Sequence, residues 1–148
     1  MNYTQKASVS GALTYPYQQI TLDLSTGYDF TKLNSSPITI LTATTSYILC
    51  PAQIVVQYKN SGLLPNDTIY FGYETLLNAN AGTAYIGLNL TTMAGQRGAF
   101  TFTTRFYNND YCDTSNTQPL ILWMNADVNV NFDNFFLTIT YIEIPNLI

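Results

Sequence analysis

Residues 51–73 constrain the fold of this chain more than any other stretch, because two β-rich runs flank a turn-rich segment. The runs are 54–58 and 68–73, and their Val, Ile, Tyr and Phe side chains suit a pleated, half-buried surface. The segment between them, 59–67, carries Asn-Ser-Gly and Pro-Asn-Asp, which favour turns. The pattern predicts a β-hairpin with a long loop in the middle of an all-β domain.

Alternating or β-rich segments continue on both sides of this stretch, and no segment keeps a helical period. We expect strands at 18–24, 37–43, 54–58, 68–73, 83–90, 99–107, 120–125 and 135–144, with a short strand or bulge at 47–50 and a helical turn near 28–33. This pattern predicts a single antiparallel β-sandwich of about eight strands, either jelly-roll or immunoglobulin-like. The sandwich would span 18–148, and residues 1–17 would form an N-terminal arm.

If successive strands run antiparallel, their connections alternate between the two ends of the sandwich. One end would gather 44–51, 74–82 and 108–119, and the other 25–36, 59–67, 91–98 and 126–134. Cys50 and Cys112 would then share one end. Asp67, Arg97, Asp127 and Asp133 would share the opposite end.

Charged residues are scarce in this chain. Asp, Glu, Lys and Arg make up 9% of it, against about 25% in ordinary globular domains. Thr, Asn, Ser, Gln and Tyr must therefore cover the surface, which weakens repulsion between copies. We expect many copies to pack against one another or on a shared scaffold; the alternative is a free β-domain with a hydroxyl-rich surface.

The distribution of charge argues against nucleic-acid and membrane partners. The net charge is −4, and the five cations are scattered along the sequence without a basic cluster: Lys6, Lys32, Lys59, Arg97 and Arg105. No apolar run approaches the length of a transmembrane helix. The first residues lack the apolar core of a signal peptide, so both cysteines are expected as reduced thiols.

Residue types exclude most catalytic chemistry. The chain has no histidine, so it cannot build a Ser-His-Asp or Cys-His pair or a histidine metal site. Cys50 follows an apolar run and is expected to be a buried structural thiol. Glu74 and Glu143 are the only glutamates, and neither has a recognisable acid/base context. We expect no enzyme activity and no cofactor.

Several polar and aromatic residues are candidates for contacts with a partner. Asp110 and Asp113 lie among Asn108, Asn109 and Asn116, which suits either a solvated Asx-rich turn or a Ca²⁺ site. The polar row of period two from Asn125 to Asp133 predicts the wet face of an edge strand, with cation or sugar binding as the alternative. Trp123 stands in an apolar strand and is expected to be buried.

Three tyrosines are the candidate contact residues. Tyr111 lies in the long polar loop and is the best placed to stack on a sugar ring. Tyr15 and Tyr17 lie in the N-terminal segment, which is either a frayed terminus or a docking arm.

The order of these signals resembles that of a known group of proteins. Residues 33–41 (LNSSPITIL) precede 48–51, the run 54–58 (IVVQY) leads to 67–73 (DTIYFGY), and 120–122 leads through a polar turn to 136–141 (FLTITY). This resembles small β-sandwich proteins of tailed-bacteriophage virions across about residues 20–144. The closing strand continues beyond Tyr141, where such proteins often stop, and the 108–119 loop is longer than in that pattern.

The resemblance implies a non-enzymatic virion part, such as a capsid decoration protein, a head-fibre base or a tail accessory. Such a protein would be made in the host cytoplasm, would form homo-oligomers and would dock on other capsid or tail proteins. The alternative is a module of a phage adhesion device that recognises carbohydrate or another receptor through loops lined by Tyr and Asn.

Overall fold

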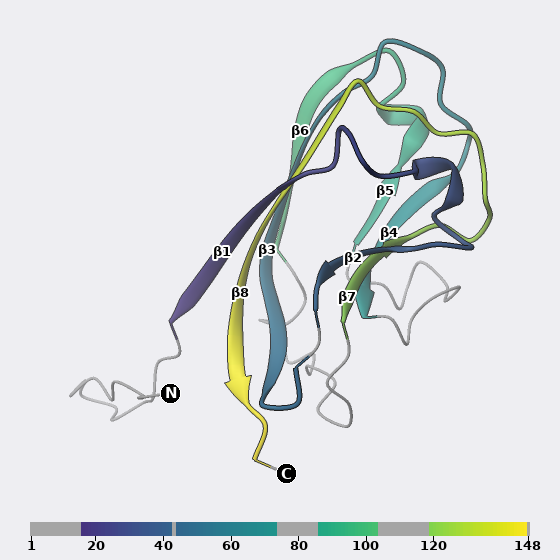
Figure 1. Ribbon diagram of the computed structural model, residues 1–148. Helices are drawn as coiled ribbons and strands as arrows, with labels where there is room; N and C mark the ends of the chain where they lie inside the picture. Colours follow the sequence, from purple (N-terminus) through teal and green to yellow (C-terminus); the bar gives the residue numbers. More distant parts are fainter. Residues whose placement is uncertain (1–15, 43, 74–85, 104–118, 148) are drawn as a thin grey trace.

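The chain is an all-β sandwich of two four-stranded antiparallel sheets (Figure 1). The computed structural model describes residues 16–42, 44–73, 86–103 and 119–147. The strands are β1 (Tyr17–Asp23), β2 (Ile38–Leu41), β3 (Tyr47–Lys59), β4 (Thr68–Tyr73), β5 (Ile86–Asn89), β6 (Arg97–Thr103), β7 (Leu120–Trp123) and β8 (Asn134–Pro145), with two 3-10 turns, η1 (Phe30–Lys32) and η3 (Leu90–Thr92). The eight-stranded sandwich predicted from the sequence is confirmed.

The order of the strands decides between the two predicted topologies. One sheet has the order β1-β8-β3-β6 and the other β2-β7-β4-β5. The first four strands therefore pair with the last four in reverse order, β1 with β8, β2 with β7, β3 with β6 and β4 with β5. A long two-stranded ribbon that rolls up in this way is a jelly roll, and an immunoglobulin-like sheet would combine different strands.

The predicted hairpin of residues 51–73 is wrong. β3 and β4 do not pair, because β3 lies between β8 and β6 in one sheet and β4 lies between β7 and β5 in the other. The connection between them crosses the sandwich, and its Leu64 packs against the core. The central residues of β4, from Ile69 to Gly72, are all buried, so this strand needs neighbours on both sides rather than one hairpin partner.

β3 is one long strand rather than two short ones. It runs without a break from Tyr47 to Lys59, and a register shift between Pro51 and Gln53 accommodates the proline, which lacks a backbone N–H. The Tyr73 hydroxyl donates a hydrogen bond to the Leu49 carbonyl and so links β4 to β3 across the sandwich. The separate element expected at 47–50 is therefore the first part of β3.

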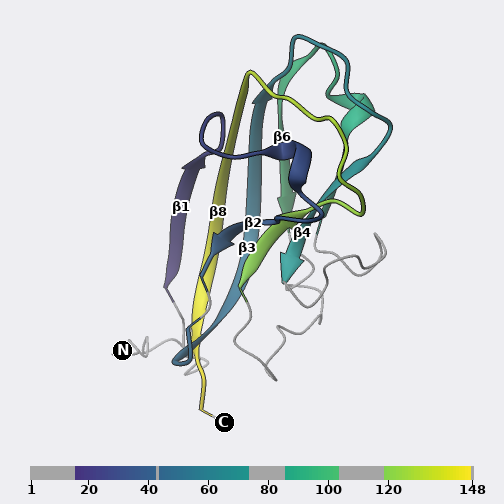
Figure 2. The same ribbon diagram turned by 45° about the vertical axis from the view of Figure 1, so that its right-hand side comes forward.

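Alternating side chains from both sheets fill the space between them. Ile54, Val56, Leu137 and Ile139 come from one sheet, and Ile69, Phe71, Leu120 and Leu122 from the other. At one end, Phe30 of η1 meets Phe132 and Phe135 with ring centroids 5.4 and 5.0 Å apart. Figure 2 shows η1 on the connection that crosses from β1 to β2, so this turn closes the core at that end. It falls within the helical turn predicted near 28–33.

Four connections meet at this end, at the top of Figure 1, as the antiparallel argument predicted. We call them the loop cluster: residues 24–37, 60–67, 90–96 and 124–133. They are joined by hydrogen bonds, for example from the Leu90 amide to the Asp67 carbonyl at 2.9 Å and from the Met124 amide to the Leu33 carbonyl at 3.4 Å.

Asn60 is the buried polar residue that ties three of these connections together. Its Nδ2 donates to the Asn131 carbonyl at 2.6 Å, and its Oδ1 accepts from the Gly95 and Gly62 amides at 3.0 and 3.2 Å. Its backbone amide donates to the Gln96 carbonyl at 2.8 Å. Only 6% of Asn60 is exposed, so water cannot replace these bonds when the amide is removed.

We predict that Asn60→Ala lowers the free energy of unfolding by about 3 kcal/mol, because it leaves buried amide and carbonyl groups without partners. The measurement is urea unfolding followed by the fluorescence of Trp123, the only tryptophan. Asn66→Ala is the matched control, since Asn66 lies in the same connection and is exposed. Equal effects of the two substitutions would contradict the proposed role of Asn60.

The expectation of reduced thiols is wrong for Cys50. This residue is fully buried in β3, as expected, but it forms a disulfide. The chain has one other cysteine, Cys112, which lies outside the described residues. The first residues of the chain carry no information about the redox conditions under which the folded protein matures.

We predict that peptide mapping without reductant finds Cys50 joined to Cys112, since no other partner exists within the chain. Cys50→Ser should lower the free energy of unfolding by about 2–4 kcal/mol, because the bridge restricts the unfolded chain. Wild-type protein treated with a reductant should unfold like the variant. Two free thiols in the untreated, denatured protein would refute the prediction.

Candidate functional site

The structure describes one of the three candidate contact tyrosines. Tyr17 is the first residue of β1, pairs with Ile142 and is 56% exposed. Tyr15 and Tyr111 lie outside the described residues, as do Asp110 and Asp113. Within the described ranges, no group of three Asp, Glu, Cys or His residues is placed to hold a metal ion. Because Tyr17 belongs to the sheet, the arm cannot include it.

Residues 124–133 are a connection and not the edge strand that their alternation suggested. The alternation itself is real, because Val130 and Phe132 are buried while Asn129 and Asn131 are exposed. The segment makes no ladder because it crosses from β7 in one sheet to β8 in the other. Its buried apolar residues pack on the end of the core, and its Asp127 and Asp133 side chains accept hydrogen bonds from neighbouring connections.

Asp127 joins this segment to the connection between β1 and β2. Its Oδ1 accepts hydrogen bonds from the Asn34 and Ser35 amides at 2.9 and 3.0 Å. The Ser35 side chain and these two amides hold the pKa of the Asp127 carboxyl below its ordinary value. Hydrogen bonds from the Thr31 and Ser25 side chains and amides lower the pKa of Asp29 and Asp23 in the same way. These carboxylates are therefore occupied as structural acceptors.

We predict that the protein loses stability in acid. A carboxylate whose pKa is lower in the folded chain stabilises the fold above its unfolded value, which is near 3.8 for Asp, and this contribution disappears as pH falls through the folded value. Asp127→Asn should lower the urea midpoint at about pH 7 and have a smaller effect at about pH 3. Asn125→Ala, in the same connection, should shift both midpoints equally. An effect of Asp127→Asn that is independent of pH would contradict this assignment.

Trp123 is fully buried, as predicted, and so cannot offer a ring face to a sugar. It lies beside Tyr70 on the β2-β7-β4-β5 sheet, with ring centroids 5.7 Å apart. Its indole Nε1 has no hydrogen-bond partner among the residues that the structure describes. Trp123 is a packing residue, and its fluorescence reports on folding.

The outer face of the β1-β8-β3-β6 sheet carries two rows made of six uncharged polar side chains and one valine. One row reads Thr21, Thr138, Val55 and Thr101 across the four strands, and the next includes Gln19, Thr140 and Gln53. The Thr21 and Thr138 hydroxyls lie 2.9 Å apart, and Gln19 Nε2 donates to the Thr140 hydroxyl at 3.2 Å. We call these seven residues the hydroxyl face.

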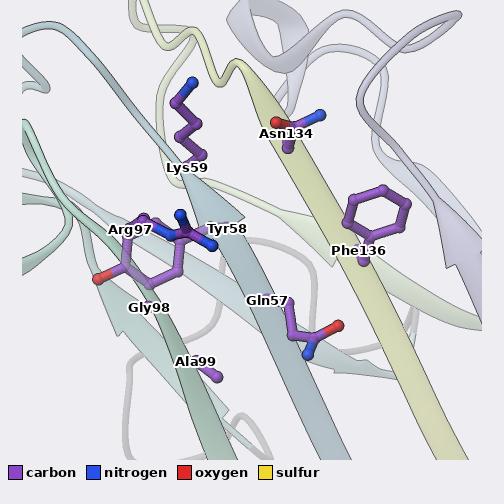
Figure 3. Close-up of a pocket in the computed structure, with 8 residues that line it drawn as sticks. All are labelled: Gln57, Tyr58, Lys59, Arg97, Gly98, Ala99, Asn134 and Phe136. Atoms are coloured by element: carbon purple, nitrogen blue, oxygen red, sulfur yellow. The ribbon is translucent and has the colours of Figure 1, made fainter.

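A shallow hollow of about 630 Å³ adjoins the hydroxyl face at the loop-cluster end of the same sheet (Figure 3). We call it the basic hollow; it is lined by Gln57, Tyr58, Lys59, Arg97, Gly98, Ala99, Asn134 and Phe136. Arg97 and Ala99 of β6 lie on one side and Asn134 and Phe136 of β8 on the other, with Gln57 and Lys59 of β3 between them. The small side chain of Ala99 leaves the hollow open.

The pairing of β3 with β6 brings together two cations that seemed scattered in the sequence. Lys59 is the direct register partner of both Arg97 and Asn134. The five cations of the chain are far apart in sequence, and a search for basic runs therefore misses this pair. Only the register of β3 against β6 reveals it. The alternation of antiparallel strands predicts no more than that Arg97 and the 59–67 connection lie at the same end.

No family model matches this chain, and no curated protein matches it in sequence. No helix in the described part of the chain is long and apolar enough to cross a membrane.

Proposed function

We propose that this protein is a non-enzymatic structural component of a virus particle, a capsid-associated decoration, auxiliary or head-fibre protein of a tailed bacteriophage. It acts by self-association and by docking on other virion proteins. The observation that carries the proposal is the hydroxyl face, a sheet surface of seven exposed or half-buried residues without a charge. The resemblance of residues 20–144 to phage virion β-sandwiches supports the same function.

The chemistry of the hydroxyl face suits contact with a second copy of itself. A threonine hydroxyl donates one hydrogen bond and accepts others. A row of threonines can therefore both donate hydrogen bonds to an identical row and accept hydrogen bonds from it. The face is free of the like-charge repulsion that keeps ordinary surfaces apart. A two-fold contact through one patch is also the commonest way in which identical subunits associate.

Two further features support a virion component. The jelly roll is a fold of many viral capsid proteins, although it also occurs in lectins and enzymes and does not decide function by itself. The Cys50 disulfide fits a protein that persists on a particle outside the reducing cytosol.

We predict that the wild-type chain forms a defined oligomer and that Thr101→Lys dissociates it, because a charge at the β6 edge of the hydroxyl face would be buried against its copy. Thr39→Lys is the matched control. Both threonines are exposed on an edge strand, but Thr39 lies on the other sheet. Native mass spectrometry over a concentration series measures the outcome. A wild-type monomer at every concentration would refute self-association, and an intact Thr101→Lys oligomer would refute this face.

The role of an N-terminal arm is tested by removing residues 1–15. The deletion stops before Tyr17 because that residue pairs with Ile142, and its loss would damage β1 itself. Dissociation of the shortened chain would show that the arm joins the subunits. An unchanged oligomer would assign the contact to the sandwich alone.

The second candidate function is carbohydrate recognition in a phage adhesion device. The observation that favours it is the basic hollow, where the Gln57 and Asn134 amides and the Phe136 ring lie together. Amides and an aromatic ring are the polar and apolar groups that small-molecule sites combine. A glycan array probed with the wild-type chain and with Tyr111→Ala tests whether the 108–119 loop, in place of the hollow, recognises the carbohydrate. Binding that is lost in the variant would place recognition at the loop.

A further inference from the structure

The two cations of the basic hollow form an unfavourable arrangement within the chain itself. Lys59 and Arg97 are direct cross-strand partners, and like charges in that position repel each other. Neither forms an ion pair with a residue in the described ranges, and no lining residue of the hollow is acidic. Two carboxylates adjoin these rows of the ladder; Asp23 accepts a hydrogen bond from the Ser25 amide and Asp133 accepts one from the Ser61 hydroxyl.

The scarcity of charge makes this pair informative. The described residues include three cations, Lys32, Lys59 and Arg97, and two of them line one hollow of a protein with a net charge of −4. An anion bound between them would relieve their repulsion. A guanidinium fork matches the two oxygens of a carboxylate, and the ammonium of Lys59 adds a second charged donor.

The remaining walls suit a sugar ring more than a bare anion. A volume of about 630 Å³ is much larger than a carboxylate needs and lies in the range of small-molecule sites. From β6 to β8 the hollow spans two strand spacings, about 10 Å. Phe136, half-buried on the far side from Arg97, offers an apolar ring, while Gln57 and Asn134 offer both donors and acceptors for hydroxyl groups.

We propose that the basic hollow binds a carboxylated sugar residue, with its carboxylate held by Arg97 and Lys59 and its ring lying over Gln57 toward Phe136. This inference rests on the second candidate function, carbohydrate recognition, and not on self-association. The shared chemistry is a carboxylate on a pyranose ring, which occurs both in sialic acids and in uronic acids.

The test is a titration of the ¹⁵N-labelled full chain with sodium N-acetylneuraminate and, separately, sodium glucuronate. Saturable shifts confined to the amides around Gln57, Ala99 and Asn134 are expected from at least one of them, and the stronger ligand identifies the source. Arg97→Gln and Lys59→Gln should each weaken binding about tenfold, because each removes a charge-assisted hydrogen bond. Trp123 fluorescence during urea unfolding shows that the variants remain folded.

Lys32→Gln is the matched control, since it removes the same charge from an exposed residue outside the hollow and should change binding less than about twofold. Acetate and methyl glucoside supply the carboxylate and the sugar ring separately, and both should bind more weakly than the combined ligand. Equal binding of acetate would overturn the proposal in favour of an anion site only. Three other results would also overturn it. They are a loss of ligand affinity in Lys32→Gln equal to that in Arg97→Gln, binding of methyl glucoside as strong as that of the carboxylated sugar, and no change in the amide signals around the hollow.

The result of the sugar titration can be distinguished from the results that test self-association and carbohydrate recognition. Arg97 is not part of the hydroxyl face, so the oligomeric mass of Arg97→Gln should equal that of wild type. Loss of sugar binding at constant mass supports the hollow without bearing on self-association. A glycan array that finds only uncharged ligands would retain carbohydrate recognition and refute the carboxylated class.

Discussion

The loop-cluster end of this sandwich depends on one buried amide. Asn60 donates to the 124–133 connection and accepts from the turn at Gly95, so it joins segments that lead into three different strands. An apolar residue of the same size could fill the space but would leave the Gly95 amide and the Asn131 carbonyl without partners. β3 ends at Lys59, one residue before Asn60. The basic hollow is therefore built on the part of the sheet that this amide holds in place.

The outer face of the β1-β8-β3-β6 sheet combines two kinds of surface. Its centre is the hydroxyl face, which is uncharged and suits contact with an identical surface. Its loop-cluster end is the basic hollow, where two cations lie opposite each other. The carboxylates of Asp29 and Asp127 accept hydrogen bonds from backbone amides at the same end of the molecule, so they stabilise connections instead of neutralising the hollow.

Parts of the candidate site followed from residue types, and parts did not. The burial of Trp123 was predictable from its apolar neighbours in the sequence. The outward row in 124–133 was predictable from its period of two, but its assignment to an edge strand was wrong, because alternation records which side chains face water and not whether the backbone has a partner. The pairing of Lys59 with Arg97 was missed, because it depends on strands that are distant in sequence.

An antiparallel β-sandwich of eight strands could be predicted from the residues alone, because period-two alternation and turn residues are local signals. The meeting of connections such as 59–67 and 126–134 at one end could be predicted in the same way. The assignment of β3 and β4 to different sheets, and with it the jelly roll, follows from the strand order in the folded chain. The register of non-local strands and the redox state of Cys50 depend on contacts that no local pattern specifies, since a long connection can either return beside its own strand or cross the core.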